Sequence, residues 1–452
     1  MLKLFLWLRY LRKRKIVFLS IAAVALSVSL LIVVASLFTG FIKAFENSAN
    51  EAVGDVIISA IGNKKIADYP ILIDNLEQTA IVEVATAMLD AEGLLHLGKG
   101  NVRPVTIWGI QPARRARVTG LKEALLKQKD LPGEPSFAVS GDDTRIGGFV
   151  GIGVISEPDE QTDEYDLSLV DEIIGKRVSA TTGTVTETVV GQGDSTKPKL
   201  NRRVVSFVVT DVVSTGVYEI DSGFVFLPIE ALQDKLYRNE TKPIASEIHI
   251  RLRPDADPEL AIAVVRGIWE AFAEANLGWS ELEIRYTDIE TAQQKQSKYV
   301  AELRKQMGVL LVIFGVVSFS VIVLVFCIFY MLVTTKQKDI AIIKSCGTGS
   351  CSVAMIFIGF GACVGVIGSA LGAALGYIIT RNINTIEDWI RIVFGLKLWK
   401  SSVYMFSKIP NEVDWPSVTD IALLATAAAA IGALIPAIVA ARTKPVDLLR
   451  YE

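Results

Sequence analysis

The chain contains few of the residues that build metal centres and disulfide bridges. It has only two histidines and four cysteines among 452 residues, and their spacing matches no zinc site. The segment 43–305 has no cysteine, so it must fold without disulfides. His96 and His249 lie far apart in the sequence, and we interpret both as ordinary strand or surface residues. We expect no metal and no cofactor in this chain.

Sequence signatures of catalysis are also missing. There is no G-x4-G-K-[ST] loop, which would hold the phosphates of ATP. There is no G-x-S-x-G nucleophile motif and no H-E-x-x-H metal motif. We therefore expect no catalytic residues, and a free-standing hydrolase is the least favoured function.

Charge is absent from four long stretches, at 16–42, 306–335, 345–380 and 421–441. Each reaches the roughly 20 apolar residues that cross a hydrocarbon core, and hydrophobic residues make up 51% of the chain. A buried core helix can imitate one such stretch, but not four. We predict transmembrane helices at 16–42, 306–335, 352–380 and 421–441. Because they hold no acidic residue, an intramembrane proton relay is not expected.

Lysine and arginine predict the orientation of these helices. The segments 1–15, 336–347 and 442–452 together carry twelve basic and three acidic residues. We expect all three in the cytoplasm, together with both termini. The 43–305 segment holds the excess negative charge, so we expect it outside. The 381–420 loop has balanced charge, and its position between the third and fourth spans places it outside as well.

The outer segment 43–305 has the pattern of a mixed α+β domain. Runs rich in valine, isoleucine, phenylalanine and threonine are typical of strands. We expect strands at 55–60, 81–87, 105–110, 204–213, 223–227 and 247–252. A helix is expected from Pro258 to Asn276, because Asp257 can cap it and Gly278 follows its end.

A second long helix is predicted to lead into the second span. After an expected strand at 281–286, Thr287 or Asp288 can cap a helix that continues to Thr335. At 1.5 Å per residue this helix would extend about 70 Å, more than twice the thickness of a hydrocarbon core. It would form a stalk between the outer domain and the membrane, unless the chain breaks near Lys305.

Residues 158–172 are strongly acidic. We interpret them as a solvated loop. A calcium site is the alternative, but the D-x-D-x-D-G spacing of a calcium-binding loop is absent.

Glycines recur along the third span. They are spaced by three or four residues, which places them on one face of the helix. The five glycines are Gly361, Gly365, Gly368, Gly372 and Gly376. Small residues let helix backbones approach closely in lipid. The stripe therefore predicts helix packing, either within this chain or against another. The fourth span is rich in alanine, and Pro436 should bend it near its cytoplasmic end.

Two cytoplasmic segments resemble surface helices. KQKDIAIIKSCG (336–347) alternates apolar and charged residues, which predicts a short amphipathic helix that Gly347 can end. A plain turn is the alternative. The segment 1–15 suits an interfacial helix, with Trp7 and Tyr10 at the level of the lipid headgroups.

Further segments occur in order along the chain: LRYLRKRK (8–15), FTGFIKAFENS (38–48), VTIWGIQP (105–112), FVVTDVVSTGVYEIDSGFVFLPIEALQDKL (207–236), KQKDIAIIKSCG (336–347), SSVYMFSKIPNEVDW (401–415) and LIPAIVAARTKPVDLLRYE (434–452). Together with the glycine-rich third span, they resemble the lipoprotein-releasing (LolC/LolE-type) permeases of ABC transporters, within the superfamily of MacB-like and FtsX-like permeases. The tail, the 336–347 segment and the STGVYEID segment are the most specific.

The resemblance implies a function that composition does not reveal. The chain would be the permease subunit of an ATP-driven transporter that extracts lipoproteins from the outer leaflet of a bacterial inner membrane by mechanical transmission. Its implied partners are two copies of a separate ABC ATPase, a second permease copy or paralogue, lipoprotein cargo, membrane lipid and, as a further candidate, a periplasmic carrier. No nucleic acid is implied.

The resemblance also implies roles for particular residues. The 336–347 segment would be a coupling helix that docks on the ATPase through Lys338, Asp339, Ile340, Ile342, Ile343 and Lys344. Cargo lipid would contact the outer ends of the first two spans at Phe38, Phe41, Met307, Leu310 and Phe314. The outer domain would have two subdomains, one of them inserted at about 116–240.

The sequence therefore predicts a multi-pass membrane protein of the α+β class with both termini in the cytoplasm. Four transmembrane helices would carry a large extracytoplasmic domain between the first two, and a helical stalk would lead into the second. MacB-like export of a peptide, lipid or drug, and FtsX-like regulation of an extracytoplasmic enzyme, are the alternative functions. The missing fused ATPase and the full-length outer domain favour lipoprotein release. The acidic stretch at 158–172 departs from the pattern of the family, and no carrier-docking loop is recognisable.

Overall fold

The computed structural model describes residues 15–442, except for 63, 99, 140, 143, 160–161, 190–195, 336 and 346. The chain divides into two compact units. The membrane unit comprises Met1–Ala44, Val300–Trp389 and Ile409–Glu452, and the outer domain comprises Phe45–Tyr299 and Ile390–Lys408. The segments predicted as an interfacial helix at 1–15 and as a cytoplasmic tail at 442–452 lie, but for one residue each, outside the described residues.

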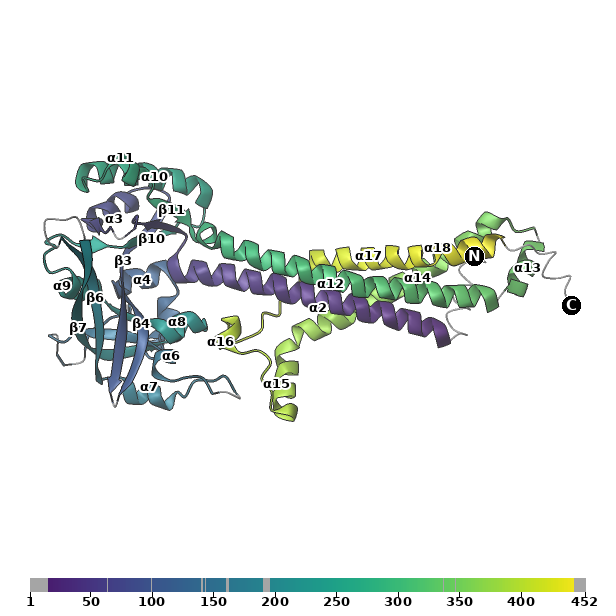
Figure 1. Cartoon of the computed structure of the whole chain (residues 1–452), viewed down its shortest axis with the longest axis horizontal. Helices are drawn as coiled ribbons and strands as arrows, with labels where there is room; N and C mark the ends of the chain where they lie inside the picture. The colour runs from purple at the N-terminus through teal and green to yellow at the C-terminus, as the bar shows by residue number, and fades with distance from the viewer. Residues whose placement is uncertain are drawn as a thin grey trace. The chain divides into compact units, whose positions relative to one another are not determined.

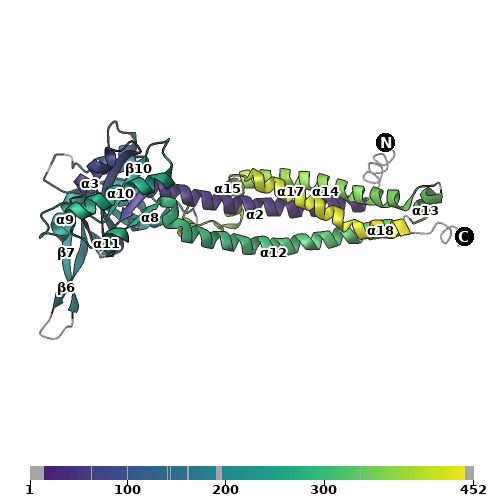
Figure 2. The ribbon, with the colours of Figure 1, turned by 90° about the horizontal axis from the view of Figure 1, so that it is seen from above.

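Among the described residues, four apolar helices are long enough to cross a membrane, and they run side by side in the membrane unit (Figures 1 and 2). They are α2 (Lys15–Val53), α12 (Ala292–Thr335), α14 (Ser350–Arg381) and α17 (Trp415–Gly432), which α18 (Leu434–Arg442) continues. The predicted class, a membrane protein with four spans and a mixed α+β domain, is confirmed.

Proline interrupts the fourth span. α17 ends at Gly432 and α18 begins at Leu434. Pro436 has no N–H to donate to the Gly432 carbonyl, so the helix loses one backbone bond at this point. The predicted bend is confirmed, in the form of a break between two helices.

α12 is one uninterrupted helix of 44 residues, about 66 Å long. It begins at Ala292, directly after the strand β11 (Asp288–Thr291). This result confirms the single long helix and excludes the alternative of a break near Lys305. Its first turns belong to the outer domain and the rest to the membrane unit.

The residues before α12 correct a prediction. The segment 281–286, expected as a strand, forms the short helix α11 (Glu281–Arg285). Ser280 caps this helix, because its Oγ accepts the N–H of Glu283 at 3.4 Å and its own N–H donates to the Glu283 carboxylate at 2.9 Å. This reciprocal capping box stabilises a helix that is too short to show a hydrophobic period.

The connections between the spans contain helices of their own. α13 (Gln337–Ser345) lies between α12 and α14, and Gly347 follows it with a φ of 88°. The segment 381–420, expected only as an outer loop, holds α15 (Ile383–Phe394) and α16 (Ser401–Tyr404).

The outer domain is built on a nine-stranded sheet with the order β11-β1-β10-β3-β4-β8-β5-β7-β6 among the described residues. Besides β11, its strands are β1 (Val56–Ser59), β3 (Val82–Gly98), β4 (Asn101–Ile110), β5 (Gly147–Gly151), β6 (Arg177–Val189), β7 (Thr196–Val213), β8 (Phe224–Pro228) and β10 (Glu247–Leu252). A small second sheet pairs β2 (Ile66–Ala67) with β9 (Ile244–Ala245). All six predicted strands are present, and β3, β4 and β7 are longer than expected.

One part of the sheet closes on itself through β3. The second half of β3 lies between two strands, since Leu95 pairs with Arg103 on β4 and with Ala180 on β6. β3, β4, β8, β5, β7 and β6 therefore form a closed ring. Four ring strands lie within the predicted insert at 116–240, but β3 and β4 precede it. The insert therefore does not fold around a sheet of its own.

Helices cover the part of the sheet outside the ring. α10 (Pro258–Asn276) has the predicted bounds, and the Asp257 carboxylate accepts the Glu259 N–H at 2.9 Å. α10 packs against α3 (Tyr69–Glu77) and β11 (Figure 1). The shorter helices are α4 (Pro112–Val118), α5 (Leu121–Ala124), α6 (Ile152–Ile155), α7 (Ser168–Ile173), α8 (Tyr218–Gly223) and α9 (Ile229–Leu236).

Candidate functional site

A buried polar network joins helices to the sheet within the outer domain. Arg115 on α4 donates to Nδ1 of His249 and to the carbonyl of Ala52 in the last turn of α2, both at 2.6 Å. His249 Nε2 donates to Glu247 on β10 at 2.8 Å, and Glu247 also accepts from Lys295 in the first turn of α12 at 2.7 Å. Because a guanidinium can only donate, the imidazole accepts at Nδ1 and carries its proton on Nε2. The ends of both long helices are thus bonded to one network.

Burial determines the charges of this network. Burial and the positive charge of Arg115 lower the pKa of His249 to about 4, so the imidazole is neutral near pH 7. Burial by itself would raise the pKa of Glu247, but the bonds to His249 and Lys295 outweigh it and hold this pKa well below its usual range. Burial lowers the pKa of Arg115 to about 10, against the opposing effect of Glu247. One partly buried carboxylate is therefore balanced by two cations and a neutral ring.

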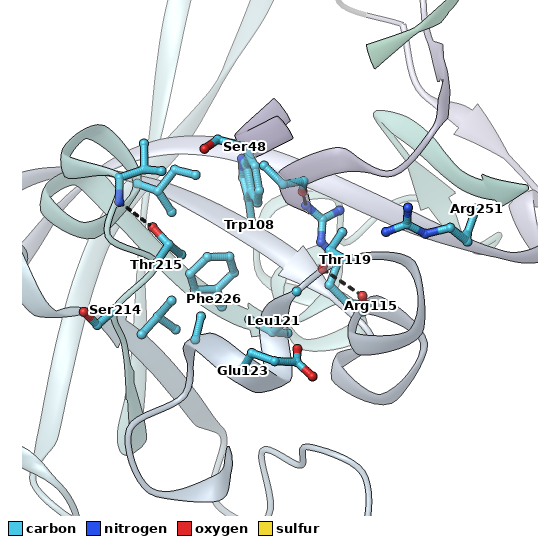
Figure 3. A pocket seen from close by; sticks show the side chains of 16 residues that line it. Ser48, Trp108, Arg115, Thr119, Leu121, Glu123, Ser214, Thr215, Phe226 and Arg251 are labelled. Carbon is cyan, nitrogen blue, oxygen red and sulfur yellow. Dashed lines mark hydrogen bonds between the residues drawn. The ribbon is translucent and has the colours of Figure 1, made fainter. Parts of the chain in front are cut away.

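An open pocket of about 430 Å³ adjoins the network in the outer domain (Figure 3). The rings of Trp108 and Phe226 line it, and the Arg115 guanidinium lies 5.0 Å from the centre of the Trp108 ring. Arg251 lines the pocket too, but its guanidinium donates to a carboxylate and a carbonyl of the domain. Both arginines are thus engaged within the protein, and the pocket offers mainly apolar surface.

The acidic stretch holds a distant segment on the outer domain. Asp163 has a left-handed φ of 57°, and its side chain is only 5% exposed. Its carboxylate accepts the N–H of Ser401 at 2.8 Å, while Lys397 donates to the carbonyl of Thr162 at 2.8 Å and lies 3.9 Å from Asp163. We name these contacts the acidic clasp. The predicted solvated loop thus includes one buried carboxylate. No cluster of histidine, cysteine, aspartate or glutamate suited to a metal occurs among the described residues.

The STGVYEID segment forms the second attachment of 390–408. Asp221 is buried and accepts three hydrogen bonds, from the N–H and hydroxyl of Thr215 and from the N–H of Gly216, at 2.7 to 3.0 Å. Burial raises the pKa of Asp221 to about 6, against these bonds. The turn that results presents the N–H of Tyr218 to the carbonyl of Met405 at 2.8 Å. This motif therefore has a structural task, which is to fix the segment between α14 and α17 on the outer domain.

The residues predicted to contact an ATPase differ in burial and in their contacts. Ile340 is buried in the core of the membrane unit, whereas Ile342 is 53% exposed. Lys344 donates to the carbonyl of Ala441 on α18 at 2.7 Å. The side chains of Lys338, Asp339 and Ile343 lie outside the described residues. Among the described side chains of this set, Ile342 is the one that offers free apolar surface.

The glycine stripe of α14 lies against two neighbouring helices of the membrane unit. A methyl group added at Gly361 or Gly365 would meet α17 or Ala433, the residue that follows it, and one added at Gly368, Gly372 or Gly376 would meet α2. The closest approaches are 2.5 Å from a side chain at Gly361 and 2.6 Å from a carbonyl oxygen at Gly372. Real side chains do not tolerate such distances, so these positions allow the helices to touch backbone to backbone.

The residues predicted to contact cargo lipid lie on two helices of the membrane unit. Phe38 and Phe41 are on α2, Met307, Leu310 and Phe314 are on α12, and all five are partly exposed. None of them lines the nearby cavity of about 380 Å³ between α2, α12 and α17.

That cavity was not anticipated from the sequence. It is lined by aliphatic residues apart from Ser27 and Ser318, whose hydroxyl oxygens lie 2.9 Å apart. The two serines bond to one another, and the rest of the cavity wall is apolar.

Comparison with known proteins finds similarity to permeases. Residues 311–445 match the family of FtsX-like permease C-terminal domains. The chain is 28% identical to the lipoprotein-releasing system transmembrane protein LolC of Neisseria meningitidis serogroup B, over 100% of this chain and 99% of the relative. It is 25% identical to LolC of Xylella fastidiosa over 98% of both chains. A third relative, LolE of Haemophilus influenzae, is 31% identical over 31% of this chain and 33% of its own length. The predicted resemblance to lipoprotein-releasing permeases is confirmed.

Two solved structures resemble part of the chain. The periplasmic region of MacB from Actinobacillus actinomycetemcomitans is 13% identical, with a TM-score of 0.30, over 55% of this chain and 95% of that one. The extracellular domain of the transporter YknZ from Gram-positive bacteria is 12% identical, with a TM-score of 0.29, over 52% of this chain and 98% of that one.

Proposed function

We propose that this chain is the permease subunit of an ATP-driven transporter that releases lipoproteins from the outer leaflet of the bacterial inner membrane. The observation that carries the proposal is the similarity to lipoprotein-releasing transmembrane proteins along the whole of both chains. The chain itself would hydrolyse no ATP. Both termini and α13 would lie in the cytoplasm, and the outer domain would lie in the periplasm.

α13 is the proposed docking element for a separate ATPase. Ile342 would insert into a groove of that subunit, because a half-exposed isoleucine on a short helix gains by leaving water. Ile340 would have a different role from the one expected, since its burial anchors α13 on the membrane unit. The bond from Lys344 to α18 would fix the helix at its other end. A displacement of α13 would therefore be transmitted to the spans.

α2 and α12 are the proposed transmitting elements. Each is a single helix with residues in both units, and the last turn of α2 and the first turn of α12 are bonded to the buried network around Glu247. An uninterrupted helix transmits displacement because its backbone hydrogen bonds resist stretching. ATP-driven movement of the spans would thus move the outer domain and expel cargo. Two ATPase copies would drive two permeases.

A second permease, either another copy or a paralogue, would face α12. The span of α12 has the smallest buried share of the four spans. Its side chains Val309, Val312 and Val316 are all more than 60% exposed. Cargo acyl chains would enter between two such faces, near Phe38, Phe41, Met307, Leu310 and Phe314. Charged substitutions at these five positions would then impair release without unfolding the protein.

Affinity purification of the full chain in mild detergent tests the proposal. We expect an ABC ATPase and acylated lipoprotein to copurify, and ATP to discharge the lipoprotein to an acceptor protein added in solution. Copurification of the ATPase with a peptide or drug would favour export, and copurification with an extracytoplasmic enzyme would favour regulation. A chain that binds no ATPase would contradict the proposal altogether.

A further inference from the structure

α15 exposes most of its large apolar side chains, whereas its polar Asn384 is bonded to the protein and its Glu387 is buried. Trp389, Ile392 and Val393 are all more than half exposed, and Ile392, at 78%, is highly exposed. Their spacing of three and four residues places them on one face of the helix. Apolar exposure continues past the end of α15 at Leu396 and Leu398. We name Trp389, Ile392, Val393, Leu396 and Leu398 the α15 apolar face.

The opposite face of α15 is committed to the protein. At 100° per residue, Asn384 and Glu387 lie on the far side of the helix from Trp389. The Asn384 side chain donates to the carbonyl of Ile409 at 3.0 Å and accepts the N–H of Ile409 at 2.9 Å. Glu387 is buried. A helix on the surface of a water-soluble domain has the reverse arrangement, with its apolar face inward.

The position of α15 identifies the surroundings of this face. α14, a membrane-spanning helix, ends at Arg381, and α15 begins two residues later at Ile383. Trp389 is then only six helical residues from the start of α15, a length of about 9 Å. The apolar face therefore cannot lie far from the membrane surface at which α14 ends. Tryptophan is enriched at that level of a bilayer.

We propose that the α15 apolar face binds the lipid surface of the membrane and lies among the upper acyl chains at the end of α14. Lipid is the partner that both observations require: the face is continuous in sequence with a span that already crosses the bilayer, and its polar side is already bonded to the protein. Contiguous apolar patches facing water are rare on soluble surfaces, whereas interfacial helices bury such a face several ångströms into the lipid.

This placement would give the segment between α14 and α17 two anchors. α15 would be held by lipid, while the acidic clasp holds Lys397 and Ser401 on the outer domain. α15 would then occupy a fixed position beside the spans and displace lipid there. The inference does not depend on the cargo, since it concerns lipid contact in the resting protein.

Spin labelling in lipid tests the proposal on the full chain. Single cysteines replace Ile392 and Val393 in a variant whose native Cys327, Cys346, Cys351 and Cys363 are serine, reconstituted in phosphatidylethanolamine–phosphatidylglycerol vesicles. Collision with oxygen, which concentrates in lipid, is compared with collision with a water-soluble nickel chelate. Two leucines that are each 70% exposed serve as matched controls, Leu423 on the span α17 and Leu260 on α10 of the outer domain.

We expect the labels at 392 and 393 to behave like the label at Leu423, where collisions with oxygen exceed collisions with the chelate. The label at Leu260 should show the reverse ratio. A ratio at 392 equal to that at Leu260 would place the face in water and overturn the proposal. Protection of 392 from both reagents, with spin–spin broadening, would show that a second copy covers the face and would also overturn it. A native circular dichroism spectrum and ATPase binding check that each labelled variant is folded.

Discussion

Two spans of this chain use glycine in opposite ways. α14 packs its glycines against α2, α17 and Ala433, so that an added methyl group at Gly372 would lie 2.6 Å from a carbonyl oxygen. α12 carries Gly308 and Gly315 with nothing within 4 Å of an added methyl group, and Gly315 lines the cavity between α2, α12 and α17. The same residue type therefore marks a close contact in one helix and unfilled space in the other.

The difference separates what holds the chain together from what it offers to other molecules. The closed contacts include the network around Arg115 and the acidic clasp. The open surfaces include Ile342 on α13, the outer part of α12 and the α15 apolar face. Substitutions at closed contacts should lower the free energy of unfolding, whereas substitutions at open surfaces should change function at nearly constant stability.

Breaking the Arg115 network should have the largest effect on stability. Arg115→Met removes a buried cation and leaves Nδ1 of His249 and the Ala52 carbonyl without their donor. We expect the free energy of unfolding of the outer domain to fall by about 3 kcal/mol or more, as is usual when one partner of a buried charged network is removed. Denaturation followed by tryptophan fluorescence would measure it. Arg117→Met, an exposed position on the same helix, should change stability by less than about 0.5 kcal/mol. Equal effects of the two substitutions would contradict the network.

Acid should weaken the same network before other parts of the domain. The pKa of His249 is about 4 in the folded protein, below its ordinary value of about 6.5. Between these values the unfolded chain binds a proton that the folded chain does not, so stability falls as pH is lowered from about 6.5 to 4, by at most about 1.4 kcal/mol per unit. His249→Gln should flatten this slope. A slope unchanged by His249→Gln would argue against the neutral buried imidazole.

Alanine substitutions compare the two kinds of glycine directly. Gly372→Ala should destabilise the membrane unit by about 1–3 kcal/mol, because α2 and α14 must move apart. Gly315→Ala should leave it unchanged or slightly more stable, since alanine favours a helix over glycine by up to about 1 kcal/mol. Thermal unfolding of the purified protein in detergent measures both. A loss of stability at Gly315 as large as that at Gly372 would mean that α12 also makes a close contact there.

The acidic clasp should contribute a smaller amount. A double-mutant cycle on Asp163→Ala and Lys397→Ala should give a coupling energy of about 1 kcal/mol, because both side chains are largely buried. The exposed pair Glu172–Lys176 is the matched control, expected at about 0.3–0.5 kcal/mol. If the coupling at the clasp does not exceed that of the exposed pair, the clasp is an ordinary surface contact.

Local sequence patterns predicted the parts of the fold that depend on neighbours in sequence. α10 has the predicted bounds because its cap, its first-turn proline and the glycine after its end all lie within the segment itself. α11 was predicted as a strand because five residues are too few to show a period, although Ser280 and Glu283 already formed the capping pattern. The single helix α12 followed from the absence of any helix breaker.

Local sequence patterns could not predict the long-range contacts. His249 lies in a predicted strand, but its partner Arg115 is 134 residues away, and no local pattern joins them. The closure of the ring through β3 and β6 and the burial of Asp163 depend in the same way on distant segments. The apolar face of α15 lies in a segment expected only as a loop. Each of these features requires tertiary structure to bring its members together.

We propose that a separate ATPase moves this chain by binding α13, and Ile342→Asp tests this proposal most directly. The full chain, its partner permease and the ATPase are reconstituted in vesicles with an acylated lipoprotein, and ATP hydrolysis and lipoprotein release are measured together, with Ile342→Leu as the control. We predict that Ile342→Asp lowers release per ATP hydrolysed by about tenfold, which corresponds to about 1.4 kcal/mol of lost contact, while the free energy of unfolding stays constant. Release per ATP equal to that of Ile342→Leu would contradict the account.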